Sequence, residues 1–256
     1  MATVIGHSNQ IDLATLSGGT WNAAYPLASL KTRYLAQKAR TSNALAASSV
    51  IDLDLLAAQA IGVVALVAHN LTSAATVRIQ GSSAASQTPV LYDSTAQTIY
   101  TGGPDYAKSF TPVSARYWRI SIVDTANPAG YIALGRVFIG PAFAPAAGLA
   151  WGPGLAVESK TNVAEALGGM EFFDTRPNRR VWTGELAWLS DAEAWALWHP
   201  IQRAMDVYNE VYLIEDTADT AYRAQRNFLG RLRQLSPIQW PYVNQHACGV
   251  EIAELL

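Results

Sequence analysis

The chain has 256 residues and a mass of 27.6 kDa, enough for two domains of ordinary size that each bury a core. Its formal net charge is −2 and its pI is near 6.1, which excludes a nucleic-acid scaffold because phosphate neutralisation needs clustered lysine and arginine. Half of the residues are hydrophobic and only 15% are charged. This composition fits a surface that partner proteins cover in part, and it fits an alanine-rich globular protein equally well.

The N-terminal residues Met1–His7 lack the basic-then-apolar order of a secretory signal, and no apolar run is long enough to span a bilayer. We therefore expect no membrane span and synthesis in a reducing cytoplasm. The single cysteine, Cys248, excludes an intrachain disulfide. Its place in a strand-like segment predicts a buried structural thiol.

Short strand-like runs separated by turns dominate the first half of the chain. They are Val50–Leu55, Ile61–His69, Ala75–Gly81, Gln97–Tyr100, Tyr117–Val123 and Ile132–Ile139. Many short strands with little helix predict an antiparallel β-sandwich. For the segment Leu53–Ala68 a buried helix is the competing prediction, because Leu55, Leu56 and Gln59 also fit helical spacing.

Two runs near the end of this half alternate apolar and polar residues, Ala115–Asp124 strictly from Tyr117 and Gly130–Gly140 less cleanly. The Pro- and Gly-containing segment between them predicts a turn that joins the two as an antiparallel pair. The sequence of these two runs resembles that of the closing strands of galactose-binding-like (discoidin-type) β-sandwiches, in which "A-R-Y-x-R-I" is followed by "G-Y-x-x-L-x-x-V-x-I". This resemblance implies that residues 1–143 form a galactose-binding-like sandwich of the jelly-roll kind.

The run Gly140–Gly148 contains Pro, Gly and Ala and cannot continue a strand ladder, so it predicts a linker, which we place at residues 144–149. The remaining residues, 150–256, then form a second domain. Its strand-like runs are Leu155–Lys160, Val181–Leu189, Val211–Ile214, Tyr222–Leu235 and Val250–Leu255.

Ser190 and Glu193 form a capping box at the start of a helix that is predicted to run to about Tyr208. Its apolar stripe consists of Trp195, Trp198, Ile201, Met205 and Tyr208. Pro200 lacks the backbone N–H that would bond to Ala196, so a kink or a restart is expected near His199. Strands around one main helix predict an α+β domain.

No catalytic motif is visible, because the chain lacks G-x-S-x-G, a P-loop and H-E-x-x-H, and its four histidines have no second ligand at metal-binding spacing. Asp52 and Asp54 share one strand face and could hold calcium or act as paired carboxylates. Solvated carboxylates on an outer face are the favoured interpretation. We therefore predict no metal, no cofactor and no enzymatic activity.

Exposed aromatic residues in loops are the remaining functional pattern. In sugar-binding sandwiches such rings stack on pyranose faces, while Asp, Asn and Arg bond the hydroxyls. The candidate contacts for a glycan or a partner protein are Trp21, Asn22, Tyr25, Tyr100, Asp105 and Tyr106. Core packing or contact with a neighbouring subunit is the alternative interpretation for each.

The second half contains Arg180–Glu193, a strand that ends "L-x-W-L-S" and runs into a capped helix, and an acidic closing strand at Gly249–Leu255. This sequence pattern resembles that of the globular domains of tailed-bacteriophage baseplate and tail-tip proteins, including the distal tail family. The resemblance implies a structural protein of the virion tail that is assembled in the host cytoplasm. It would form a symmetric ring or collar, with copies of itself and other tail proteins as partners, and link the tail tube to distal tail proteins.

The alternative function is that of a carbohydrate-binding protein that recognises host-surface glycans through the N-terminal sandwich. The two functions are compatible, because a tail protein can display a sugar-binding sandwich.

Overall fold

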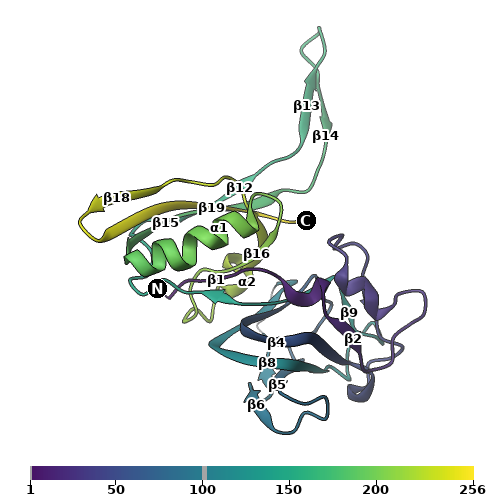
Figure 1. The fold of residues 1–256 in the computed structure, drawn as a ribbon. Helices are drawn as coiled ribbons and strands as arrows, with labels where there is room; N and C mark the ends of the chain where they lie inside the picture. Colours follow the sequence, from purple (N-terminus) through teal and green to yellow (C-terminus); the bar gives the residue numbers. More distant parts are fainter. Residues whose placement is uncertain (1, 100–102) are drawn as a thin grey trace. The chain divides into compact units, whose positions relative to one another are not determined.

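The computed structural model describes residues 2–99 and 103–256, and the chain divides into two compact units (Figure 1). The first unit extends to Ala144 and also contains Tyr212–Phe228. The second unit contains Pro145–Val211 and Leu229–Leu256. The predicted boundaries, 1–143 and 150–256, do not include this return of the chain to the first unit.

The first unit is built on antiparallel strands in the order β10-β4-β8-β5-β6, with β2 paired to β4 and β7 paired to β5. The strands are β2 (Thr15–Ser17), β4 (Val50–Val67), β5 (Thr76–Ser82), β6 (Val90–Asp93), β7 (Gln97–Thr98), β8 (Tyr106–Val123) and β10 (Arg136–Gly140). This arrangement confirms the predicted antiparallel β fold. It also shows that the segment Leu53–Ala68 is strand and not helix.

The two longest strands, β4 and β8, pair along almost their whole length. Their ladder runs from Val50↔Ser121 to Leu66↔Tyr106 and is interrupted by register shifts. Strand β5 adds to the C-terminal half of β8, whereas β10 adds to the C-terminal half of β4. The halves therefore belong to two layers, and buried side chains from both layers form one core.

The expected pairing of Ala115–Asp124 with Gly130–Gly140 is wrong, because β8 and β10 lie on opposite edges of β4. The segment between them is not a hairpin turn. Asn127 Nδ2 donates to Asp124 Oδ2 (2.8 Å) and to the Asn70 carbonyl (3.0 Å), which ties this loop to the one after β4. Alternation identified both strands, but it carries no information about which strand lies beside them.

Trp118 is fully buried in the core of the first unit. Its ring lies 5.9 Å from the ring of Phe110 and 6.1 Å from the ring of Tyr92, centroid to centroid. A Cβ at Gly81 would lie 3.0 Å from the indole, so glycine on the neighbouring strand provides room for this large side chain.

A short ladder explains why the chain returns to the first unit. Strand β1 (Val4–Gly6) pairs with β11 (Ala142–Phe143) and with β16 (Glu210–Ile214), and Ile5 lies opposite both Phe143 and Leu213. Tyr212 packs its ring 5.9 Å from that of Phe138. The smaller elements of this unit are η1 (Gln10–Asp12), η2 (Leu27–Lys31), β3 (Ala39–Arg40), η3 (Ala46–Ser48), β9 (Ala133–Leu134) and α2 (Arg223–Arg226).

The second unit contains antiparallel strands in the order β17-β19-β15-β12, with β18 on the same edge of β19 as β17. Their bounds are β12 (Gly154–Glu158), β15 (Arg179–Leu189), β17 (Phe228–Leu232), β18 (Ile238–Tyr242) and β19 (Gln245–Glu254). A helical segment follows β15 directly and packs on this sheet through Trp198 and Ile201, which are buried. This is the predicted α+β arrangement with one main helix.

The capping box is confirmed: Glu193 N donates to Ser190 Oγ (3.3 Å), and Ser190 N donates to Glu193 Oε2 (3.0 Å). The helix begins as a π-helical segment, η4 (Ala192–Trp198), and becomes α-helical in α1 (His199–Met205). The change falls at the restart expected from Pro200, because a proline is tolerated at the first positions of a new helical segment.

Two details of the helix prediction are wrong. The helix ends at Met205, not at Tyr208, because Asp206 has a positive φ of 47°. Trp195 and Tyr208 are exposed, and the buried face includes Ala194 instead. The wide π turn changes the angular step per residue, so a stripe drawn for an α-helix loses its phase there.

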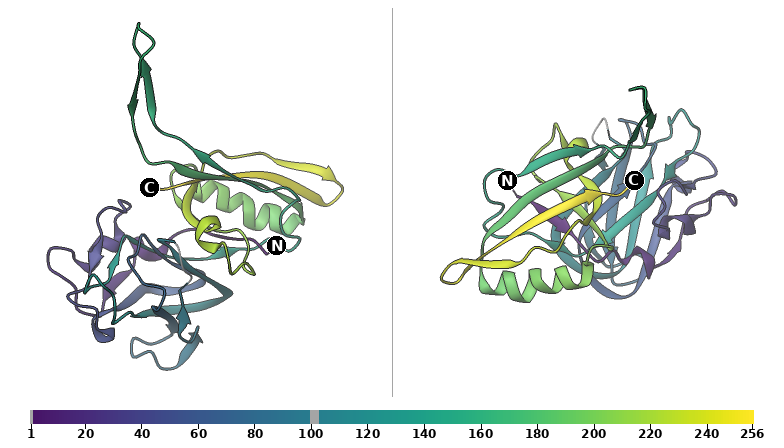
Figure 2. Two further views of the ribbon diagram at one scale, coloured as in Figure 1. Left: turned by 180° about the vertical axis from the view of Figure 1, so that it is seen from behind. Right: turned by 90° about the horizontal axis from the view of Figure 1, so that it is seen from above.

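The hairpin of β13 (Asn162–Glu165) and β14 (Glu171–Asp174) projects from the sheet of the second unit (Figures 1 and 2). Every residue of its two strands is exposed. Gly169, with φ of 80°, lies in its tip. The sequence analysis did not predict these strands, because a ribbon without a buried face has no clean apolar–polar alternation.

An ion pair between a buried arginine and a partly exposed aspartate joins η1 to β10 in the first unit. Arg136 is completely buried, and its Nη2 lies 2.8 Å from Asp12 Oδ1, while its Nη1 donates to the Leu30 carbonyl (3.3 Å). Removing one partner of such a pair leaves a charge in a medium where it is poorly solvated.

We therefore expect Asp12→Asn to lower the free energy of unfolding of the first unit by about 3 kcal/mol. Arg78→Gln is the matched control, because the Arg78 guanidinium is half exposed in its pair with Asp93, so water screens the pair and its loss should cost much less. Urea unfolding followed by tryptophan fluorescence measures both variants. Equal losses in the two variants would contradict this account of Arg136.

Candidate binding surfaces

Several loops of the first unit meet at one end of the sandwich, which we call the loop end. The loop after β4 and the loop after β8 are joined there, because Thr72 Oγ1 donates to Asp124 Oδ1 (2.7 Å). Asn70 Nδ2 donates to the Tyr131 carbonyl (3.0 Å), and Thr41 N donates to the Ile132 carbonyl (2.9 Å). These bonds place residues far apart in sequence on one surface.

Arg40 is held between two tyrosines at the loop end. Its guanidinium carbon lies 4.0 Å from the centroid of the Tyr25 ring and 5.1 Å from that of Tyr131. Arg40 N donates to the Tyr25 carbonyl (3.0 Å), and strand β3 pairs with β9 through Arg40↔Ala133. In the described part of the chain the guanidinium makes no ion pair or hydrogen bond, and its Nε is buried without an acceptor. The residue as a whole is half-buried, and a guanidinium has four further N–H donors on its two Nη atoms, so these are the donors that a ligand would reach.

The predicted residues Trp21, Asn22 and Tyr25 lie together on this surface. Trp21 is half-buried, packs against the hydrophobic core as its alternative interpretation predicted, and donates through Nε1 to the Gly18 carbonyl (3.0 Å). Asn22 is exposed, its Oδ1 accepts from Ala24 N (2.9 Å), and its backbone N donates to the Arg40 carbonyl (2.9 Å). The turn after Ser17 therefore places these side chains beside Arg40.

The other three predicted residues do not join this surface. Asp105 is buried and accepts from Ala68 N (3.0 Å), so its carboxylate pairs the first backbone N–H after β4. Tyr106 is the first residue of β8 and its ring is part of the hydrophobic core. Tyr100 lies outside the described residues. Composition and turn context did not distinguish a loop tyrosine from one that begins a core strand.

Two residues at the loop end that the sequence analysis did not select are Lys38 and His69. His69 is buried, its Nδ1 accepts from Leu71 N (3.2 Å), and its Nε2 has no partner in the described part of the chain. Burial, followed by the nearby charge of Lys38, lowers the pKa of His69 to about 4. His69 is therefore neutral at pH 7. Nothing in the sequence marked these residues, because strand and loop connections alone bring them together.

Asp52 and Asp54 lie on an outer strand face and are each engaged by an arginine of β8. Arg119 Nε lies 2.6 Å from Asp52 Oδ1, and Arg116 Nε lies 2.7 Å from Asp54 Oδ1. The hydrogen bonds from Arg116 hold the pKa of Asp54 below its usual value. These carboxylates are thus committed to ion pairs, which supports neither a calcium site nor a general acid.

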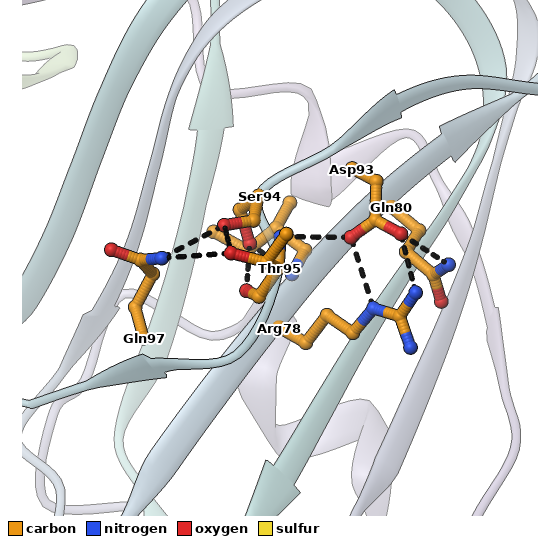
Figure 3. A network of polar contacts seen from close by, with 7 residues as sticks. Arg78, Gln80, Asp93, Ser94, Thr95 and Gln97 are labelled. Atoms are coloured by element: carbon orange, nitrogen blue, oxygen red, sulfur yellow. Dashed lines mark hydrogen bonds and ion pairs between the residues drawn. The ribbon is translucent and has the colours of Figure 1, made fainter.

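A polar network lies on the solvent-facing side of β5 and on the turn between β6 and β7 (Figure 3). Asp93 accepts from Arg78 Nε (2.9 Å), Thr95 N (2.8 Å) and Gln80 Nε2 (3.2 Å). Gln97 Nε2 donates to the Ser94 carbonyl (2.9 Å). Because its charges and amides satisfy one another, the network stabilises the turn between β6 and β7, the two strands that pair with the same side of β5.

The second unit carries an exposed aromatic surface formed by Trp188, Trp195, Trp240 and Tyr242. Trp188 stacks on Tyr242 with centroids 5.4 Å apart, and Trp195 lies 5.6 Å from Trp240. Trp188 has a φ of 59° at the register shift between Leu186 and Leu189. A left-handed backbone is unfavourable for a bulky residue, by about 1–3 kcal/mol, and here it accompanies an exposed indole.

His246 stabilises this aromatic surface from below. It is buried, its ring makes edge contacts with Trp195 (5.8 Å) and Trp240 (5.7 Å), and its Nε2 lies 2.6 Å from Asp191 Oδ1. Cys248, two residues away, is also buried, and burial raises the pKa of its thiol. The thiol lies 3.4 Å from Gln202 Nε2.

Within residues 2–99 and 103–256, no group of three histidine, cysteine or acidic side chains could hold a metal ion. No helix in the same residues is long and apolar enough to cross a membrane.

No protein-family description and no curated protein matches the chain. Among solved structures, the chain is similar to a mutant of the lectin binding domain of lectinolysin complexed with Lewis b. The sequences are 14% identical, the match covers 53% of this chain and 97% of that chain, and the TM-score is 0.42. The family 32 carbohydrate-binding module of Clostridium perfringens NanJ, in complex with galactose, matches at 14% identity over 53% of this chain and 98% of that one, with a TM-score of 0.43. A Streptococcus pneumoniae fucose-binding module matches at 13% identity, 52% and 95% coverage and a TM-score of 0.42. Similarities of this size carry no functional argument by themselves.

The low pKa of His69 makes the stability of the first unit depend on pH. In the unfolded chain His69 takes up a proton near pH 6.5, whereas in the folded unit it does so only near pH 4. Stability is therefore complete above about pH 6.5 and falls by up to about 1.4 kcal/mol per pH unit as the pH drops toward 4. Burial lowers the pKa of His7 to about 4 as well, which adds to the slope in the same direction.

His69→Asn should reduce this slope, because asparagine retains an acceptor for Leu71 N but does not titrate. Urea unfolding at pH 7.5, 6 and 5 measures the slope in the variant and the parent. An identical slope in both would show that His69 is not responsible.

Proposed function

We propose that the first unit binds carbohydrate at its loop end. The observation that carries the proposal is the Arg40 guanidinium, which lies between two tyrosine rings with its donors uncommitted. A pyranose offers hydroxyls to a guanidinium and apolar C–H faces to aromatic rings. Trp21 supplies a further ring and Asn22 an amide beside it. The role is one of binding, without catalysis.

Arg40→Ala should weaken binding of a recognised glycan at least tenfold in a calorimetric titration of the full chain, with the ligand first identified on a glycan array. Arg116→Ala is the matched control, because the Arg116 guanidinium also lies over a tyrosine, 4.8 Å from the Tyr117 centroid, but is engaged by Asp54. Arg116 also lies farther from the loop end. The pair Val50↔Ser121 is beside the loop end, and Asp54↔Tyr117 is at the other end of that paired segment.

The control should bind as the parent does. No binding of any glycan at millimolar concentration, or unchanged binding by Arg40→Ala, would contradict the proposal.

We propose a second function, carried by the second unit: assembly into a phage or phage-like tail tip or baseplate. The chain would form a ring or collar of copies in the virion tail, assembled in the host cytoplasm, and would link the tail tube to distal tail proteins. The exposed aromatic surface and the exposed apolar hairpin support this function, because both leave apolar side chains uncovered in the isolated chain. The two functions are compatible in one protein.

Light scattering coupled to size exclusion tests this second function over a range of concentrations. The full chain should self-associate, or should assemble when mixed with the products of the adjacent genes. A compact monomer at high concentration that also fails to co-assemble would contradict the assembly function, and it would leave carbohydrate binding unaffected.

A further inference from the structure

The hairpin β13–β14, with its connecting residues 166–170, forms what we call the arm. Its apolar side chains are all more than half exposed: Val163, Leu167, Met170, Phe172 and Phe173. Successive strand residues point to opposite faces, so Phe172 and Phe173 give the arm an apolar side chain on each face. A two-stranded ribbon cannot bury such residues against itself and is marginally stable alone.

The tip of the arm also carries two like charges. Glu165 lies directly opposite Glu171 in the hairpin register, and like charges in this position repel. Neither carboxylate makes an ion pair with any residue that the structure describes. A surface that covers the arm should therefore be both apolar and cationic.

The aromatic surface of the same unit supplies the apolar part, and Arg203 beside it supplies a cation. Asp191, the carboxylate beside this surface, is engaged by His246. Beside it lies a shallow depression of about 380 Å3, lined by His199, Pro200, Arg203 and Ala204, and the His199 ring lies 5.7 Å from that of Trp195. Arg203 makes no ion pair in the described part of the chain. Val163 and Phe173 share one face of the arm with Glu165 and Glu171. The exposed rings would cover Val163 and Phe173, and Arg203 would neutralise the glutamates.

The arm and the aromatic surface of one copy cannot meet, because they lie at opposite ends of the sheet (Figure 1). The arm leaves the sheet between Glu158 and Arg179, near the pair Val181↔Ala253. The aromatic surface lies near the pair Leu189↔His246. Strand β15 advances about 26 Å between these two pairs, and the arm points away from the sheet in the left view of Figure 2.

We propose that the arm of one copy docks on the aromatic surface of a second copy, with Glu165 and Glu171 facing Arg203. The proposal rests on the assembly function above. An aromatic side chain buries about 150–250 Å2 when it is fully covered. These rings are already about half buried, so the two surfaces together offer on the order of 500–1,000 Å2, the size of a weak and reversible interface. Different surfaces meet at the two sides of this contact, so repetition closes into a ring or continues as a filament.

The base of the arm is suited to hold it in place. Glu158 Oε2 lies 2.7 Å from Arg179 Nη2, and Glu158 Oε1 lies 2.7 Å from Lys160 Nζ. Hydrogen bonds from Arg179 first, and from Lys160 second, lower the pKa of Glu158 to about 2. This ionic base therefore stays intact at mildly acid pH.

A mixing experiment with two variants of the full chain tests the proposal. The arm variant is Phe172→Ser with Phe173→Ser, and the surface variant is Trp240→Ser with Tyr242→Ser. All four side chains are exposed, so circular dichroism should show both variants folded. Each variant alone should self-associate at least 30-fold more weakly than the parent, because each lacks one half of every contact.

Mixed in equal amounts, the two variants should form a dimer that does not grow further, because one copy retains a sound surface and the other a sound arm. Leu13→Ser, which removes an exposed apolar side chain from the first unit, is the control and should assemble like the parent. As a second measurement, Glu171→Arg and Arg203→Glu should each impair assembly, and the combined variant should restore it.

The outcomes separate the two proposals. If the parent chain assembles and each variant alone assembles equally well, the docking of the arm on the aromatic surface is overturned and the assembly function stands. Monomeric variants that form no dimer on mixing would likewise show that another surface or another protein covers the arm. A parent chain that neither self-associates nor co-assembles would remove both proposals.

Discussion

The first unit depends on the pairing of β4 with β8. Each strand is 18 residues long, and the register shifts in their ladder allow the two halves to contribute to different layers. The core side chains of both layers therefore come largely from one strand pair, with Trp118 between them. The same pairing sets which ends of the strands lie together, and so it determines which loops meet at the loop end.

Polar groups in this protein fall into two classes, those engaged by other protein groups and those left available. Asp52, Asp54 and the network around Asp93 are engaged by arginines and amides, so they stabilise strands and offer little to a ligand. The Arg40 guanidinium is different, because two aromatic rings hold it in place without using its donors. In the second unit a similar contrast holds for tryptophans. Trp198 is buried in the unit, whereas Trp188 is exposed and has a left-handed backbone conformation.

Much of the fold could be predicted from local patterns. Alternation located Tyr117–Val123, a continuous apolar run located the buried strand Ile61–Val67, and the Ser190–Glu193 box located the helix start. What failed was non-local. The neighbours of β8 and β10, the return of Tyr212–Phe228 to the first unit and the phase change at the π turn all depend on tertiary packing that no short window contains.

The candidate site shows the same limit. Trp21, Asn22 and Tyr25 could be selected because exposed aromatics follow a glycine turn, whereas Arg40 and Tyr131 could not, since each comes from a separate segment and only the β3–β9 pairing unites them. Asp105 and Tyr106 had a similar local context but begin a core strand. Residue type indicates which interactions a side chain can make. Only the fold determines whether other protein groups already engage that side chain.

The most direct test of this account is the arginine Nε–H spectrum of the full chain, recorded by nuclear magnetic resonance during titration with a glycan identified on an array. The account predicts that the Arg40 resonance, assigned by its loss in Arg40→Lys, shifts in proportion to saturation while those of Arg116 and Arg119 stay in place. A titration in which the glycan binds but Arg40 is unaffected would contradict it.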